Sequence, residues 1–427
     1  MTALKARKSN MFRTKSEPGG NLGSFHRHGA TGLMVQSTDR SSVERQTLSE
    51  FLAATTDLSP DRVAELGPMF ASIVGATAAR ILIVDYAQEL LIPLGEQRGP
   101  GEEVSLEGTV AGRVFCLGDA ITTQGEPAIT RICLAEGAER FGVIEVEHGT
   151  TFKGDTTTLD AALRILVLTI VSKRRYTDVV LKARRTRPLS IAAEMQWDLL
   201  PPLNCSTSAV AVSGTLEPAY STGGDSFDYA INANRLDFAI IDAVGHGLPA
   251  ILKSALAVNT IRNARREGAG LTDAYTEVDS AMEHQFGNCY YVTGIIGSID
   301  LLTAEFVWIN AGHHLPLLVR NGALCGDLVC APSLPMGLGG DVVQVMKNTL
   351  QPDDRILFFT DGVIEGRAAD RALFGVERLG DLFVRSSLDQ LSTAETTRRL
   401  TLSLLDYCSN ELRDDATVLV VHYKGGR

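Results

Sequence analysis

The spacing of hydrophobic and polar positions along the chain predicts where its helices and strands lie. From about 48 to 74 the apolar residues recur at helical spacing, and the run ARILIVDY that begins at Ala79 is typical of a strand. Two more strands are expected around the turn AEGAERFG, followed by an apolar helix in TLDAALRILVLTIVSKR. Residues 46–173 are therefore predicted to form an α+β domain.

A basic stretch and then a helical pattern follow this domain. In LSIAAEMQWDLLPP, the residues Ala192, Met195 and Leu199 repeat on one helical face, and Pro201 with Pro202 ends the pattern. We expect residues 174–202 to form a linker helix that contacts both neighbours. A signalling helix and an ordinary helix at a domain edge remain equally open.

After Pro202 the pattern changes to strands and turns, and acidic residues stand where apolar strands begin or end. The four positions are Asp225 after paired glycines, Asp242 after RLDFAII, Asp361 after RILFFT, and Asp414 before the strand ATVLVV. One Asp-Gly pair after a strand is usually only a turn. Four carboxylates at one sheet edge, however, would repel one another unless cations neutralise them.

The residue types in this set predict the metal and the reaction. Oxygen ligands without His or Cys favour Mg²⁺ or Mn²⁺ over zinc. Two such ions activate water and bind phosphoryl oxygens, so hydrolysis of a phosphomonoester is predicted. The sequence has no Gly-x-Ser-x-Gly, no Cys followed by Arg at phosphatase-loop spacing, and neither of the simplest nucleotide-binding motifs.

Composition narrows the class of protein further. The 427 residues are enough for two domains, and the net charge of −11 argues against broad nucleic-acid binding. No apolar run approaches the length of a membrane span, and seven scattered cysteines without a Cys-x-x-Cys pair fit a reducing cytoplasm. Residues 1–45, rich in Ser, Gly, Lys and Arg, are expected to be a disordered basic tail.

At the acidic positions the chain resembles the metal-dependent serine/threonine protein phosphatases, in the bacterial branch of the stage II sporulation protein E and the stress-response phosphatases. The ordered motifs that carry this resemblance, over about residues 190 to 423, are GGDSFDY, DAVGHG, NAGHHLPLLV, PMGL, DDRILFFTDGVIEGR, FGVER and RDDATVLVV. The resemblance implies a sandwich of two β-sheets flanked by helices in residues 203–427. It also implies a phosphorylated anti-sigma-factor antagonist as the substrate.

Carried over residue by residue, the resemblance implies a two-ion Mn²⁺ or Mg²⁺ site with Asp242 as the bridge. Its ligands would be Asp225, Asp242, the carbonyl of Ala243, Asp361 and Asp414. Asp228 and Asp415 are adjacent alternatives, ranked as supporting or structural. Ser226 replaces the usual aromatic residue of the branch, and His246, His313 and His314 are expected to be turn or packing residues. Neither a general acid nor a phosphate-binding arginine is assigned.

The N-terminal domain resembles a GAF domain, a small sensory domain of bacterial signalling. The resemblance is carried by Gly108, Gly112, the turn Gly118-Asp119-Ala120 and FGVIEVEH. It implies a small-molecule or protein effector and allows a homodimer. A catalytically silent sensor or scaffold of the same fold, which binds a signalling partner, is the alternative to a regulated phosphatase.

Overall fold

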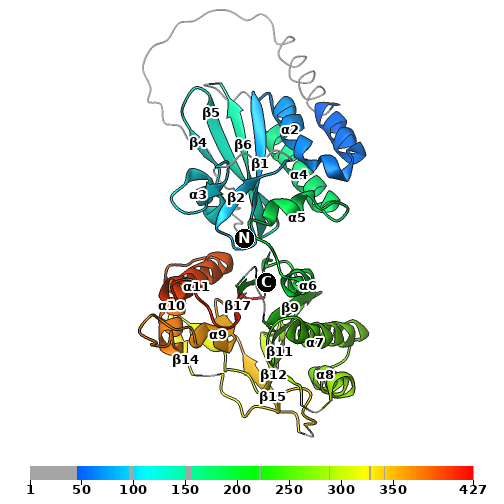
Figure 1. Cartoon of the computed structure of the whole chain (residues 1–427), viewed down its shortest axis with the longest axis vertical. Helices are drawn as coiled ribbons and strands as arrows, with labels where there is room; N and C mark the ends of the chain where they lie inside the picture. The colour runs from blue at the N-terminus through cyan, green and yellow to red at the C-terminus, as the bar shows by residue number, and fades with distance from the viewer. Residues whose placement is uncertain are drawn as a thin grey trace, which may run out of the picture.

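The chain forms two domains, which lie one above the other along the long axis of the molecule (Figure 1). The computed structural model describes residues 46–95, 101–149, 156–218, 220, 223–287, 289–326, 328–340 and 342–426. The basic tail 1–45 lies outside the described residues.

The N-terminal domain is built on a six-stranded antiparallel sheet of order β3-β2-β1-β6-β5-β4. Its strands are β1 (Ala78–Val84), β2 (Leu90–Pro93), β3 (Val104–Ser105), β4 (Ile121–Thr123), β5 (Ala128–Glu136) and β6 (Glu139–His148). Its helices are η1 (Pro60–Glu65), α2 (Leu66–Val74), α3 (Val110–Leu117) and α4 (Thr156–Lys173), and residues 46–57 are also helical.

Alternation along the central strands divides the core of this domain between the two faces of the sheet. In β1, Ile81 and Ile83 pack with α2 and α4, whereas Leu82 and Val84 pack with α3 on the opposite face. A strand buried on both faces has to be continuously apolar, and the buried part of β1, ILIV at 81–84, is. The predicted α+β domain is confirmed in this sense, while its GAF-like character stays a prediction.

Two short helices join the domains. They are α5 (Val179–Arg184) and α6 (Ile191–Leu199), and Figure 1 shows them at the junction. Pro188 lies between them, and proline disfavours helical backbone in the residue before it. The side chain of Ser190 caps α6 by accepting a hydrogen bond from the N–H of Ala193.

The C-terminal domain is a sandwich of two antiparallel sheets, of orders β15-β12-β11-β10-β9 and β14-β13-β16-β17-β8-β7. The first sheet contains β9 (Ser226–Asn232), β10 (Arg235–Ala243), β11 (Val292–Asp300), β12 (Glu305–Ala311) and β15 (Val345–Thr349). The second contains β7 (Asn204–Ser206), β8 (Val210–Glu217), β13 (Leu317–Arg320), β14 (Ala323–Cys325), β16 (Arg355–Phe359) and β17 (Ala416–Tyr423).

Helices cover both outer faces of the sandwich. α7 (Leu248–Glu267) and α8 (Leu271–Phe286) pack on the first sheet, and α10 (Val376–Leu388) and α11 (Thr393–Tyr407) pack on the second. α9 (Asp361–Ile364) is a single turn after β16. Between the sheets, the rings of Phe238 and Phe358 meet with centroids 4.7 Å apart. The predicted sandwich of two sheets flanked by helices is confirmed.

Candidate metal centre

The four predicted aspartates lie at one end of the sandwich, two from each sheet. Asp225 directly precedes β9 and Asp242 is near the end of β10; these strands pair antiparallel, with Ile241 opposite Ser226. Asp361 follows β16 and Asp414 precedes β17, two strands that also pair antiparallel. Antiparallel pairing places the end of one strand beside the start of its neighbour, so each sheet contributes two carboxylates to the same edge.

Glycines beside the aspartates allow backbone segments to approach closely. A Cβ on Gly224 would lie 2.4 Å from the carbonyl oxygen of Ala243, and one on Gly362 would lie 1.9 Å from the carbonyl oxygen of Asp415. Neither distance is possible for a real side chain. The glycines of the GGD and TDG motifs are therefore needed to bring the acidic loops together.

The carboxylates repel one another at this end of the sandwich. Burial, followed by the charges of Asp361 and Asp414, raises the pKa of Asp242 to about 7. Burial, followed by Asp242 and Asp415, raises the pKa of Asp225 well above its usual range. Burial also raises the pKa of Asp414. The cluster is thus poorly compensated by the protein's own cations.

Asp228 and Asp415, the aspartates adjacent to the predicted ligands, have different surroundings. Asp415 is buried; its carboxylate accepts a hydrogen bond from the N–H of Asp225 at 3.5 Å, and burial raises its pKa to about 6. Asp228 instead accepts hydrogen bonds from Arg262 and Arg265 of α7, each at 2.8 Å. Asp228 is therefore an internal ion-pair partner that ties β9 to α7.

Two threonines donate hydrogen bonds to carboxylates of the cluster, and the sequence pattern did not predict this role for them. Thr360 donates to Oδ2 of Asp225 at 2.6 Å and accepts from the N–H of Thr417 at 2.9 Å. Thr293 donates to Oδ2 of Asp242 at 3.4 Å. The only sequence signal for Thr360 is its place at the end of an apolar strand, directly before Asp361.

A third supporting residue comes from the helix between the domains. The side chain of Gln196 in α6 is buried, and its Nε2 donates to the backbone carbonyl of Asp225 at 2.7 Å. Gln196 also hydrogen-bonds the carboxylate of Asp415 and lowers its pKa, against the larger effect of burial. The sequence shows that a glutamine lies in this predicted helix, but it does not show which residues the glutamine contacts.

The histidines surround the site without forming a ligand group. His246 lies near Asp414 and lowers its pKa electrostatically. His313 is buried; its Nδ1 is 3.2 Å from Oγ1 of Thr293, and burial lowers its pKa to about 3, so the ring is neutral. His314 stacks on Phe359, with centroids 6.0 Å apart.

The donor set fits hard divalent ions. Within the described ranges, no three His, Cys, Asp or Glu side chains form a ready-made metal-binding group. Mg²⁺, the harder of the two candidate ions, commonly takes only one or two protein carboxylates and keeps several waters. Such ions need oxygen donors but not a closed cage of protein ligands. The mutually repelling pairs of carboxylates meet this need.

No helix in the described part of the chain is long and apolar enough to cross a membrane.

Comparison with known proteins places the C-terminal domain in a class. Residues 232–424 match the family model described as stage II sporulation protein E. The phosphoserine phosphatase RsbU of Bacillus subtilis is 23% identical over 238 residues, which cover 55% of this chain and 70% of that protein. The phosphoserine phosphatase RsbP of the same organism is 26% identical over 196 residues, covering 44% of this chain and 48% of RsbP.

Among solved structures, the SiaA-PP2C domain of Pseudomonas aeruginosa is similar at 19% identity and a TM-score of 0.47, covering 54% of this chain and 94% of that domain. These comparisons agree with one another. The C-terminal domain is similar to the stage II sporulation protein E family and to two proteins named as phosphoserine phosphatases.

Proposed function

We propose that the chain is a metal-dependent phosphatase that hydrolyses phosphoserine or phosphothreonine on a partner protein, with Mn²⁺ or Mg²⁺ at two positions in the aspartate cluster. The observation that carries this proposal is the set of carboxylates that both sheets hold together at one end of the sandwich. Burial and mutual repulsion raise the pKa of Asp225 and Asp242, and no Lys or Arg in the described part of the chain forms an ion pair with either. Phosphoserine is favoured because RsbU and RsbP are named as phosphoserine phosphatases.

Each proposed ligand, and each of the two threonines that support the ligands, has a defined role in this proposal. Asp225, Asp242, Asp361, Asp414 and the carbonyl of Ala243 would hold the two ions, with Asp242 as the carboxylate shared between them. Bound ions supply charge neutralisation and an activated water for in-line attack on phosphorus. Thr360 and Thr293 hold the carboxylates of Asp225 and Asp242 in place through the hydrogen bonds described above.

The test is hydrolysis of a phosphorylated protein by the full chain with Mn²⁺. We expect turnover that Asp242→Asn and Asp361→Asn each reduce at least about a hundredfold, because each removes a charged ligand. Asp237→Asn is the matched control: this aspartate is in the same strand as Asp242 but pairs with Arg235 at 3.0 Å. A screen with phosphorylated anti-sigma-factor antagonists tests the proposed substrate. Absence of turnover on every phosphoprotein would favour the silent scaffold.

We also propose that α6 couples the N-terminal domain to the metal centre. Trp197 packs on Tyr86 of the N-terminal domain, with ring centroids 4.7 Å apart. The adjacent residue, Gln196, hydrogen-bonds Asp225. A movement of the N-terminal domain that shifts α6 would therefore move the loop that carries a metal ligand.

In this scheme the N-terminal domain is a GAF-like sensor that responds to a small-molecule or protein effector, with homodimerisation as a further element. Sedimentation of the full chain would test the dimer. A single species of monomer mass at all concentrations would remove that element and leave the coupling through α6 in place.

A further inference from the structure

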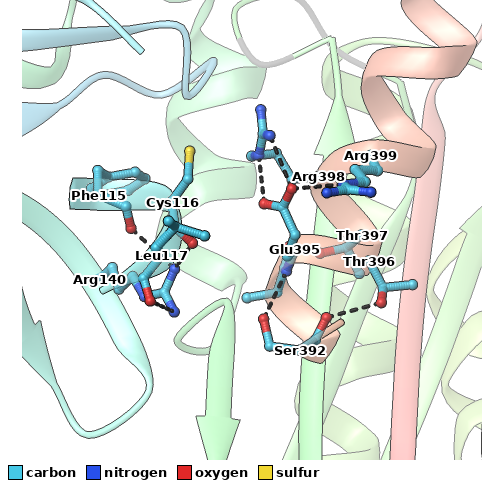
Figure 2. Close-up of polar contacts among 11 residues, drawn as sticks. Phe115, Cys116, Leu117, Arg140, Ser392, Glu395, Thr396, Thr397, Arg398 and Arg399 are labelled. Atoms are coloured by element: carbon cyan, nitrogen blue, oxygen red, sulfur yellow. Dashed lines mark hydrogen bonds and ion pairs between the residues drawn. The ribbon is translucent and has the colours of Figure 1, made fainter. Parts of the chain in front are cut away.

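A small polar cavity lies between the N-terminal domain and α11. Its volume is about 50 Å³, and its walls come from β6, from the end of α3, from the junction and from the start of α11. Figure 2 shows one side of this region, with Phe115, Cys116, Leu117 and Arg140 facing Glu395 and Arg398. The charged lining consists of four arginines and two glutamates: Arg140, Arg174, Arg184, Arg398, Glu139 and Glu395.

Two of the arginines already have structural partners. Arg140 donates to the carbonyls of Phe115 and Cys116 and so caps the C-terminal end of α3. Arg398 makes two hydrogen bonds to Glu395, at 2.9 and 3.1 Å, as Figure 2 shows. These two side chains hold the walls of the cavity in place.

Arg184 has no such partner. Its Nε is buried without a hydrogen bond, and its guanidinium lies 4.3 Å from the centroid of the Tyr86 ring. Among the described residues, no carboxylate is within ion-pair distance of it. Burial lowers the pKa of Arg184, but an arginine stays charged in a protein, so a partly buried positive charge remains.

Glu139, the carboxylate with the largest electrostatic effect on Arg184, is already engaged elsewhere. Oε2 of Glu139 accepts hydrogen bonds from the N–H and the Nδ2 of Asn204, at 2.7 and 3.1 Å. Burial raises the pKa of Glu139, which weakens its value as a counter-charge. A guanidinium has planar donors suited to an oxyanion, and the burial of the Arg184 Nε without an acceptor is unfavourable.

We propose that this cavity binds one small oxyanion group, a phosphate or a carboxylate, with Arg184 as the central donor and Arg174 as the second cation. The size agrees, because about 50 Å³ holds a few water molecules and therefore one such group. Pockets for small ligands also occur preferentially at domain interfaces.

The position of the cavity allows a bound ligand to influence the metal centre through a series of side-chain contacts. Its walls belong to both domains, so a bound anion stabilises their contact. Arg184 stacks on Tyr86, which packs on Trp197, and the preceding residue of α6, Gln196, hydrogen-bonds Asp225. This effect on turnover rests on the proposed function, whereas anion binding does not.

The experiment is calorimetric titration of the full chain with inorganic phosphate and, separately, with acetate and malonate. The chain is kept in EDTA so that phosphate cannot bind through metal ions. We expect saturable binding of at least one of these anions, weakened at least tenfold in Arg184→Gln. The choice of anion distinguishes a phosphate ligand from a carboxylate ligand.

Arg187→Gln is the matched control, since Arg187 is exposed, three positions away, and pairs with Glu89 at 3.2 Å. It should bind like the unaltered chain. Arg174→Gln serves as a second variant if Arg184→Gln does not fold by circular dichroism, and it should also bind more weakly. Absence of saturable binding at millimolar anion, or equal affinity in the folded variants, would mean that the cavity holds only water and would overturn the proposal.

Turnover with Mn²⁺ is measured afterwards on the same proteins. A change in turnover on anion addition that Arg184→Gln removes supports the route through α6. Unchanged turnover overturns that route but leaves the binding site standing. Absence of any turnover overturns the proposed function instead, and the calorimetric result is unaffected.

Discussion

At the scale of single residues, the metal centre is a place where the protein gives up stability for function. Asp225 and Asp415 are buried beside Asp242, and each raises the cost of ionising its neighbours. Like charges that the fold forces together destabilise it unless a counter-ion binds. Substitutions here should therefore affect metal-free stability and activity in opposite directions.

Asp242→Asn should stabilise the metal-free chain at neutral and higher pH. The pKa of Asp242 in the folded chain, about 7, exceeds its usual value of 3.8. Between these two pH values the folded chain therefore holds a proton that the unfolded chain has lost. Stability in EDTA should fall as pH rises from about 4 to 7, and less steeply in the variant. We expect a melting temperature about 5 °C higher for the variant at pH 8.

Calorimetric melting of both proteins at pH 5 and pH 8 measures this effect. With saturating Mn²⁺ the order should reverse, because ligand binding to the folded state stabilises the unaltered chain more. A variant that is less stable than the unaltered chain in EDTA at pH 8 would contradict the role given to repulsion.

Gly362→Ala should disrupt the centre through backbone crowding alone. Its Cβ would stand 1.9 Å from the carbonyl oxygen of Asp415, which has to move. We expect loss of Mn²⁺-dependent turnover and a stability loss of about 2 kcal/mol or more, measured by urea unfolding. Gly326→Ala is the control, since no atom lies within 4 Å of the added Cβ; equal effects of the two changes would refute the explanation.

At the scale of elements, α6 is short but contacts both domains. Its nine residues place Trp197 against Tyr86 and Gln196 against Asp225, on neighbouring positions of one helix. Neighbouring positions on a helix point in directions about 100° apart, so one helix can contact two partners at once. A movement of α6 therefore changes both contacts together.

Gln196→Leu should weaken Mn²⁺ binding by about tenfold, because hydrogen-bond partners of metal ligands contribute roughly that much to affinity. Electron paramagnetic resonance of free Mn²⁺ measures the binding directly. Glu194→Gln, on the same helix but paired with Arg185, should bind Mn²⁺ like the unaltered chain. Unchanged affinity in Gln196→Leu would separate α6 from the metal centre.

At the scale of the whole molecule, a second contact joins the domains without α6. Asp85, at the end of β1, is fully buried and accepts hydrogen bonds from Thr186 and from the hydroxyl of Tyr220, each at 3.2 Å. Tyr220 stands five residues before Asp225, the first of the proposed ligands. The N-terminal domain is thus linked to the C-terminal domain through two sets of contacts.

Tyr220→Phe should weaken this second contact between the domains. Loss of the hydroxyl removes a donor from the buried carboxylate of Asp85 and a hydrogen bond of 2.6 Å to Thr186. We expect faster amide hydrogen exchange over residues 223–232, measured by mass spectrometry on the full chain. Tyr176→Phe, at an exposed tyrosine, should leave the exchange unchanged; protection equal to that control would argue against a role for this contact.

The sequence was informative wherever the relevant pattern is local. Alternation and apolar runs predicted β1, β5, β6, β10, β16 and β17, and acidic residues at strand ends marked Asp225, Asp242, Asp361 and Asp414. The structure brings these four together because strand pairing follows from the same alternation. The paired glycines before Asp225 and the single glycine after Asp361 were visible for the same reason.

Contacts between residues far apart in the chain depended on tertiary packing. The partners of Gln196, Thr360 and Asp85 are 29, 135 and 135 positions away in the sequence, and no spacing rule connects them. The unpartnered state of Arg184 is likewise decided by which side chains the folded domains bring near it. By itself the sequence determined the elements and the carboxylates, because these follow from local periodicity. Only the tertiary structure decided which side chains support the carboxylates and how the two domains reach them, because burial and long-range hydrogen bonds exist only in the packed chain.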